Sequence, residues 1–214
     1  GKTEDYTDAQ LNNFLTLADV MATGYHSAAS AEVKEGDTVA VIGDGAVGLC
    51  GVIGARLCGA KRIIFMSHHE DRAKLGREFG ATDIVSERGD DAIKKVMGLT
   101  NGVGVDAVQE CVGAVSAIEQ AGKIARPGAV IGRVGVPQTE PSSKTLFWKN
   151  IGLRGGIANV TTYDKNILLE AVLDGEINPG KVFTKRFDLD HIQEAYEAMD
   201  KREAIKSLVI VADK

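Results

Sequence analysis

The stretch Thr38-Val39-Ala40-Val41-Ile42-Gly43-Asp44-Gly45-Ala46-Val47-Gly48 decides the fold of this 214-residue chain. It has the composition of a buried strand that runs into G-x-G-x-x-G, at Gly43, Gly45 and Gly48, and residues 49–57 are typical of a small, buried helix. The first glycine allows a tight turn, the second lets main chain approach a pyrophosphate, and the third lets helix and strand pack closely. The free N–H groups of the helix and its positive dipole end then face phosphate oxygens. The stretch therefore predicts dinucleotide binding, and the alternative is a glycine-rich turn in an ordinary α/β protein.

Segments typical of strands and helices alternate after this stretch. Strand composition recurs at residues 62–66, 83–85, 105–108, 129–134 and 151–155. Helical patterns lie at residues 70–79, 90–97 and 116–125, and Arg126-Pro127-Gly128 is typical of a turn. Strands joined by helices of about ten residues imply right-handed crossovers and a parallel sheet. We therefore predict an α/β fold with a doubly wound, six-stranded parallel sheet over residues 22–157.

The two ends of the chain do not extend this alternation. Residues 1–21 are a polar lead-in with a short helical pattern, and a second helical pattern covers residues 20–31. Near the other end, helices are predicted at 163–174 and 188–200 and strands at 182–187 and 207–212. The run from Asp190 to Gln193 resembles a capping box. We therefore predict a separate C-terminal unit over residues 158–214.

Composition excludes several classes of protein. Hydrophobic residues make up 44% and charged residues 26% of the chain, which is ordinary for a globular protein, and the net charge of −5 gives no basic surface for nucleic acid or an anionic membrane. No apolar run reaches the roughly 20 residues of a membrane span, and the polar start does not resemble a signal peptide. Cys50, Cys58 and Cys111 are scattered without a C-x-x-C pair, which favours reduced core thiols in a cytoplasmic protein.

Further motifs occur in a fixed order along the chain. They are Asp19-Val20-Met21-Ala22-Thr23-Gly24-Tyr25-His26, the glycine stretch, Gly80-Ala81-Thr82-Asp83, Gly102-Val103-Gly104-Val105-Asp106, Val134-Gly135-Val136-Pro137 and Ala204-Ile205-Lys206. Together they resemble the C-terminal part of the zinc-dependent medium-chain alcohol dehydrogenases. The resemblance implies a Rossmann domain at residues 22–157, with residues 1–21 and 158–214 as portions of the catalytic domain. The GroES-like half that carries the other zinc ligands in such enzymes has no counterpart in this sequence, which contains no Gly-His-Glu and no four-cysteine cluster.

The resemblance assigns chemistry to two residues near the start. Asp19 matches the remaining protein ligand of the catalytic zinc, and a carboxylate can bind zinc through oxygen. The alternative is an N-cap of the helix predicted at residues 20–31. Because one carboxylate cannot hold zinc tightly, we expect no zinc on this chain alone and a retained cap. Thr23 matches a catalytic residue beside the nicotinamide, and its alternative is an ordinary helix residue.

The cofactor site predicted from motif and resemblance spans several segments. Val47 is expected under the cofactor, the main chain of residues 134–136 at the carboxamide, and Lys206 at the pyrophosphate; a solvated lysine is the alternative for Lys206. The expected cofactor-binding residues are Gly43, Gly45, Ala46, Val47, Gly48, Ser67, His68, Arg72, Val112, Val134, Gly135, Val136 and Lys206.

The type of residue at the end of the second predicted strand helps to determine whether NAD(H) or NADP(H) binds. A carboxylate about 20 residues past the glycines would accept hydrogen bonds from the adenosine ribose and repel a 2′-phosphate, and Ser67 stands there instead. Ser67 can donate a hydrogen bond, and Arg72 or a protonated histidine can supply positive charge. NADP-preferring relatives pair a Ser or Gly with an Arg, and His68 takes the place of that Arg. The sequence therefore favours NADP(H) over NAD(H).

The resulting prediction is the cofactor-binding part of an oxidoreductase that transfers hydride between an alcohol or carbonyl compound and NAD(P). This chain alone is expected to bind cofactor without turnover. By resemblance, a homo-oligomer, dimer or tetramer, forms through the Rossmann domain, and Phe147 and Trp148 are core or subunit-interface residues. The alternatives are a zinc-free NADPH-dependent quinone or enone reductase of the same superfamily, and a non-catalytic module that senses NAD(P).

Overall fold

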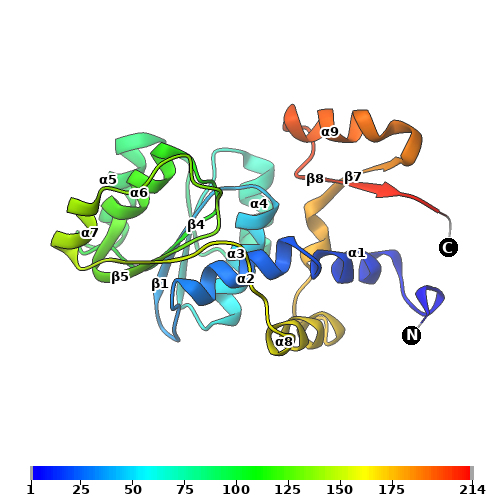
Figure 1. Cartoon of the computed structure of the whole chain (residues 1–214), viewed down its shortest axis with the longest axis horizontal. Coiled ribbons are helices and arrows are strands. Elements are labelled where there is room, and N and C mark those ends of the chain that lie inside the picture. The colour runs from blue at the N-terminus through cyan, green and yellow to red at the C-terminus, as the bar shows by residue number, and fades with distance from the viewer. Residues whose placement is uncertain (1, 213–214) are drawn as a thin grey trace.

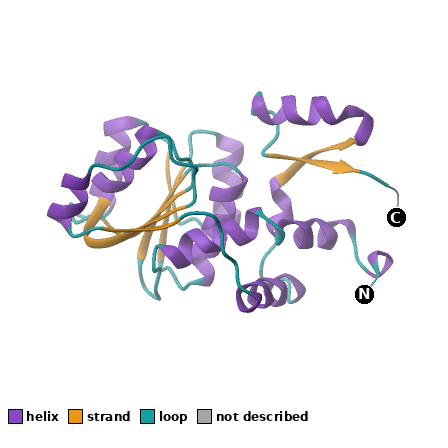
Figure 2. Cartoon of the chain, viewed as in Figure 1, coloured by secondary structure: helices purple, strands orange, loops and turns teal. Residues whose placement is uncertain are grey.

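The larger part of the molecule is a parallel sheet covered by helices on both faces. The computed structural model describes residues 2–212. Strands β1 (Thr38–Ile42), β2 (Arg62–Met66), β3 (Asp83–Val85), β4 (Val105–Glu110), β5 (Ala125–Arg133) and β6 (Gly152–Gly155) form a six-stranded sheet of order β3-β2-β1-β4-β5-β6. Every neighbouring pair runs parallel (Figure 2). The predicted doubly wound sheet is confirmed.

Alternating side chains of the strands enter two cores, one on each face of the sheet. Val39 and Val41 of β1 pack in the core that contains α2 (Val20–Ser30) and α3 (Ala46–Leu57). Ala40 and Ile42, the residues between and after them, pack in the core that contains α5 (Gly89–Leu99) and α6 (Val115–Ile124). The strands are apolar almost throughout because both faces are buried, as expected for parallel sheets. Helix α4 (Glu70–Phe79) lies on the α3 side, and its Gly76 packs directly against Phe65.

Three local predictions within this part are wrong or incomplete. Helix α3 begins at Ala46, three residues earlier than expected, because the glycine loop leads directly into its first turn. Residues 126–128 lie inside β5, where the register to β4 shifts; proline and glycine are found at such bulges. A short helix, α7 (Ser143–Lys149), precedes β6, and the Ser142 hydroxyl accepts a hydrogen bond from the Thr145 N–H at its start.

The remaining elements lie beside the sheet domain, towards the chain termini (Figure 1). They are η1 (Thr3–Asp5), α1 (Asp8–Thr16), α8 (Thr162–Leu173), η2 (Pro179–Val182), β7 (Phe183–Asp188), η3 (Leu189–His191), α9 (Ile192–Asp200) and β8 (Lys206–Ile210). Strands β7 and β8 pair in parallel as a separate two-stranded sheet. Asp188, and not the predicted Asp190, caps the turn before α9, because its carboxylate accepts a hydrogen bond from the His191 N–H.

The structure joins the two ends of the chain. The Asn13 side chain in α1 accepts a hydrogen bond from the Gly180 N–H at 2.8 Å and donates one to Asn178. Residues of α8 and η2, including Leu168 and Val182, belong to the same core as α2 and α3. The division at residues 22 and 157 stays a prediction. Within residues 2–212, no helix combines the length and apolar character that a membrane crossing requires.

Candidate functional site

The glycine loop lies between β1 and α3, and two of its glycines have opposite surroundings. A Cβ at Gly48 would collide with the carbonyl group of Gly43, so only glycine allows the helix to pack this closely against the loop. A Cβ at Gly45 would meet no atom within 4 Å, so open space lies in front of the N-terminus of α3. Gly43 has a φ of 110°, a conformation that favours glycine. The loop therefore presents uncovered main chain at a helix N-terminus, the arrangement that suits a phosphate.

A cavity of about 680 Å³ opens directly beside this loop. Its walls include Ile42 at the end of β1, Met66 at the end of β2, and Cys111 and Val112 just after β4. The strand order reverses between β1 and β4, and open α/β sheets bind ligands at the carboxyl ends of strands at such a point. The cavity has the position and size expected of a site for a nucleotide.

Part of the predicted cofactor site lines this cavity. The lining residues among those predicted are Gly43, Gly45, His68, Arg72 and Val112. The others lie outside the lining: Ala46, Val47 and Gly48 in the first turn of α3, Ser67 after β2, Val134, Gly135 and Val136 after β5, and Lys206 at the start of β8. The N–H groups of Val134 and Gly135 both donate to the carbonyl oxygen of Glu110. Each of these binding roles stays a prediction.

Asp44, a carboxylate that sequence analysis did not assign, lines the cavity and has three side-chain partners. Asp44 lies between the first two glycines, and its Oδ2 accepts a hydrogen bond from Ser67 Oγ at 2.9 Å and lies 2.8 Å from His69 Nδ1. Its Oδ1 lies 3.3 Å from Nη1 of Arg72. We call these four residues the Asp44 cluster. The signal that could have found it is an acid inside the glycine motif, next to a sequence with no acid at the end of β2.

The surroundings of the Asp44 carboxyl group favour its ionised form. Burial alone would raise the pKa of Asp44, but hydrogen bonds from His69 and Ser67 and the positive charge of Arg72 outweigh it, so the pKa lies below its ordinary value of 3.8. Ser67 is 1% exposed and Arg72 is 8% exposed. The two side chains predicted to meet a 2′-phosphate are therefore buried and directed at Asp44.

Two further side chains meet at the edge of the cavity. Nε2 of His69 lies 3.5 Å from Nη1 of Arg202, a residue that follows α9 and also lines the cavity. The neighbouring His68 instead places its Nδ1 2.6 Å from the carbonyl oxygen of Ser86. The sequence pointed to a histidine after Ser67 but assigned His68 and not His69 to the site. It missed Arg202, because nothing in the local pattern indicates that the C-terminal unit reaches this cavity.

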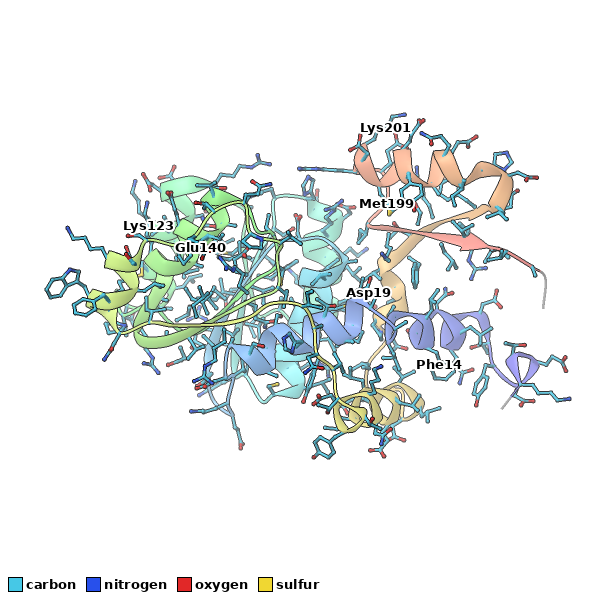
Figure 3. The ribbon with its side chains drawn as sticks, viewed as in Figure 1. Phe14, Asp19, Lys123, Glu140, Met199 and Lys201 are labelled. Carbon is cyan, nitrogen blue, oxygen red and sulfur yellow. The ribbon has the colours of Figure 1, made fainter. Side chains whose placement is uncertain are left out.

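Asp19 and Thr23 are not among the residues that line the cavity. Figure 3 shows Asp19 at the junction of α1 and α2, well separated in this view from Lys123, which lines the cavity. Asp19 is exposed and occupies the N-cap position of α2, but its side chain makes no capping hydrogen bond, so the expected cap is wrong. Thr23 Oγ1 lies 3.4 Å from Asp19 Oδ1, which is a weak hydrogen bond at most.

The described residues do not form a zinc site by themselves. Among residues 2–212, no group of three or more His, Cys, Asp or Glu side chains is placed to hold a metal ion. Asp19 can supply one oxygen ligand at most, whereas zinc in proteins takes three or four protein ligands.

The cysteines and the aromatic pair before β6 also have defined surroundings. Cys50, Cys58 and Cys111 are free thiols, and burial raises the pKa of Cys58 to about 11 and that of Cys111 to about 12.

Phe147 and Trp148 in α7 are each 75% exposed and pack edge to face against one another. Their assignment to the core is wrong, and the interface alternative stays a prediction.

The sheet order, the glycine loop at its switch point and the cavity beside that loop define a Rossmann-type α/β protein. The zinc-binding dehydrogenase family matches residues 46–170, more than half of the chain. The chain belongs to this family, the zinc-dependent medium-chain alcohol dehydrogenases, and the resemblance noted in the sequence is confirmed.

Individual relatives agree with this assignment. The chain is 31% identical over 209 residues to an alcohol dehydrogenase of Cupriavidus necator. This match covers 95% of the chain and 56% of that protein. It is 33% identical over 220 residues to the NADP-dependent isopropanol dehydrogenase of Clostridium beijerinckii, covering 95% of the chain and 61% of that protein. The solved structure of the alcohol dehydrogenase TADH from Thermus sp. ATN1 superposes with a TM-score of 0.85 at 29% identity, over 94% of the chain and 59% of that structure. The chain thus spans little more than half the length of these relatives.

Proposed function

We propose that this chain is the cofactor-binding part of an alcohol dehydrogenase, and that the intact protein transfers hydride between an alcohol or carbonyl compound and NADP(H). The observation that carries the proposal is the open space at Gly45, in front of the N-terminus of α3 and beside the cavity. A pyrophosphate in that space would accept hydrogen bonds from free N–H groups at the positive end of the helix dipole. The adenosine would then extend into the cavity towards the Asp44 cluster, which makes this the proposed adenosine end.

The charges at the cavity support NADP(H) over NAD(H). No acid stands at the end of β2 to repel a 2′-phosphate, because Ser67 occupies that place. Asp44, the carboxylate that contacts Ser67, is matched by Arg72. The rest of the cavity lining carries both signs, with Glu87, Asp90 and Glu119 as well as Arg88, Lys123 and Arg202. The relatives from Clostridium beijerinckii and Thermoanaerobacter brockii are NADP-dependent isopropanol dehydrogenases, which agrees with this preference.

The bound cofactor would supply the hydride acceptor or donor, and residues of this chain would orient it. The proposed nicotinamide end comprises Asp19, Thr23 and residues 134–136. Main chain after β5 would meet the carboxamide, and Thr23 would lie beside the ring. Asp19 would be one zinc ligand in the intact protein, with the others supplied by residues outside this chain. The presence of Asp19 favours the zinc enzymes over the zinc-free reductases, and this chain alone would bind cofactor without turnover.

The surroundings of the cofactor part support two further proposals. We propose a homo-oligomer that assembles through the β6 edge, where α7 exposes Phe147 and Trp148 to solvent. We also propose a cytoplasmic protein, because the thiols of Cys50, Cys58 and Cys111 are free, as a reducing compartment would keep them.

Calorimetric titration of this chain with NADPH and with NADH tests the proposal. Saturable binding of both, tighter for NADPH, together with no oxidation of secondary or primary alcohols by the chain alone, is the expected result. Absence of heat with either dinucleotide would refute cofactor binding, and tighter binding of NADH would refute the preference.

A further inference from the structure

We propose that Arg202, together with His69, receives the 2′-phosphate of NADP(H), so that a residue of the C-terminal unit sets the preference between the two cofactors. The ligand class is a 2′-phosphorylated adenosine. This inference rests on the proposed function, because it takes the cavity beside the glycine loop as the adenosine site.

The first argument is the balance of charge within the Asp44 cluster. Arg72 or a protonated histidine was predicted to supply the positive charge for the phosphate. The guanidinium of Arg72 instead forms an ion pair with Asp44 at 3.3 Å and lies 3.4 Å from the Asp44 carbonyl oxygen. The Ser67 hydroxyl, the predicted hydrogen-bond donor, is likewise directed at Asp44. An incoming phosphate would have to break these buried contacts, and it would then face the Asp44 carboxylate. The phosphate therefore needs cations that lie beyond this pair.

The second argument is the position of Arg202. It lines the same cavity as Gly45 and Arg72, and its Nη1 lies 3.5 Å from His69 Nε2, on the ring edge opposite the nitrogen that faces Asp44. Within the described part of the chain, its guanidinium forms no ion pair with a carboxylate. An exposed, unmatched guanidinium beside an imidazole offers the fork of N–H donors that suits phosphate oxygens.

Lys201, the residue before Arg202, does not share this position at the cavity. Lys201 carries the same charge one residue earlier, but its ammonium lies 2.9 Å from Glu197 on its own helix, and it does not line the cavity. Figure 3 shows Met199 and Lys201 at the end of α9, which is the end nearer to the sheet domain. The turn after α9 thus directs Arg202, and not Lys201, towards the cavity.

The third argument is the main chain at Arg202. Its φ of 59° lies in the left-handed region, directly after α9, where glycine is the usual residue. The N–H groups of Arg202 and Glu203 donate to the carbonyl oxygens of Met199 and Ala198, so the turn is fixed. An arginine at this position carries a conformational cost that glycine would avoid. A residue held in an unfavourable conformation is an indication of function, and here the same turn places the guanidinium at the cavity.

The main competitors are the other cations that line the cavity. Lys123 lies 3.6 Å from Asp90 and is thereby matched. Arg88 precedes α5, where it borders the cavity together with Glu87. Within the described residues, neither forms a hydrogen bond or an ion pair with a member of the Asp44 cluster, so we expect both to meet other parts of the nucleotide.

Arg202→Gly is the test variant, because glycine suits the left-handed turn and removes the guanidinium without disturbing the fold. Arg202→Asn, which also tolerates this conformation, is the second variant. Lys201→Ala is the matched control for charge, and Arg88→Ala is the control for the rest of the cavity. Each is titrated calorimetrically with NADPH, NADH, 2′,5′-ADP and 5′-AMP.

We expect both Arg202 variants to weaken NADPH and 2′,5′-ADP by about 10-fold or more while NADH and 5′-AMP keep their affinities. Lys201→Ala should leave all four unchanged, and Arg88→Ala should leave the ratio of NADPH to NADH affinity unchanged. Loss of affinity for NADPH and NADH in equal measure would mean a structural role, and unchanged affinities for both would mean no role. Either result overturns the inference while the proposed function stands. If the unaltered chain binds none of the four ligands, the proposed function fails as well.

Discussion

The two ends of the proposed cofactor site differ in how completely this chain builds them. At the adenosine end, the Asp44 cluster is largely buried and bonded internally, with one carboxylate contacted by three side chains. At the nicotinamide end, Asp19 is exposed and held by one hydrogen bond at 3.4 Å, and Val136 is 84% exposed. On the proposed function, the comparison teaches that the sheet domain would by itself recognise the adenosine half of the cofactor. The chemistry at the other half would need further residues, because the described residues hold no group of three metal-binding side chains.

The largest effect is expected from Gly45→Val. A β-branched side chain would fill the space proposed for the pyrophosphate, which both cofactors share, so binding of NADPH and of NADH should be abolished in calorimetry. The fold should persist, because a Cβ at Gly45 meets no atom within 4 Å. Gly98→Val is the matched control, since a Cβ there also meets open space but Gly98 lies in α5 and does not line the cavity. Unaltered affinity in Gly45→Val would mean that the loop is only a turn.

A smaller effect of opposite sign is expected from Asp44→Asn. Removing the carboxylate frees Arg72 and removes a negative charge near the proposed 2′-phosphate, so NADPH should bind about 10-fold more tightly while NADH changes little. Asp83→Asn is the control: it removes the same charge from an ion pair with Arg62, at the start of β2 and β3 and away from the cavity. A fall in NADPH affinity would show that Asp44 positions Arg72 for the phosphate, contrary to the charge argument.

The lowered pKa of Asp44 predicts that the protein loses stability in acid. The folded-state pKa of Asp44 lies below 3.8, so its contribution to the unfolding free energy is fully present above pH 3.8 and is lost as the pH falls through the folded-state pKa. Asp83 and Asp106 behave in the same way, because hydrogen bonds from Arg62 and from Arg126 and Thr38 hold their pKa values low. Urea unfolding should therefore show a loss of stability in this acid range, with a shallower slope in Asp44→Asn. An identical slope in the variant would contradict the buried ion pair.

The smallest effect is expected from Lys206→Ala, at the pyrophosphate between the two ends. Lys206 is half-buried at the start of β8 and would act as a single charge near the pyrophosphate. Its removal should weaken NADPH and NADH equally, by about threefold, as for a partly exposed ion pair. A selective effect on NADPH, measured in the same titrations, would move the 2′-phosphate away from Arg202.

Sequence alone predicts the sheet because local signals repeat along it. The predicted bounds of β1, β2, β3 and α4 match the structure, since apolar runs end at glycine or polar residues there. The short helix α7 was missed because its exposed residues carry no apolar periodicity. The glycine loop was found because its glycine spacing is a local pattern. Gly48 shows a steric reason for glycine, whereas Gly45 borders the open space proposed for the pyrophosphate.

The side-chain partners of the site could not be predicted in the same way. Asp44 and Arg72 are 28 residues apart, and His69 and Arg202 are 133 apart, so their contacts arise only from the fold. The absence of an acid at the end of β2 and the acid inside the glycine motif are both visible in the sequence. Only the fold shows that the Asp44 carboxylate meets Ser67 at the end of β2. Asp19 shows the converse, since its position at the start of α2 was predicted but its capping bond is absent.

The most direct test of the central claim is a pair of calorimetric titrations with NADPH, one of the unaltered chain and one of Gly45→Val. The account predicts saturable binding to the unaltered chain and none to the variant, with both proteins folded by circular dichroism. Equal heats in the two titrations, or no binding to the unaltered chain, would contradict it.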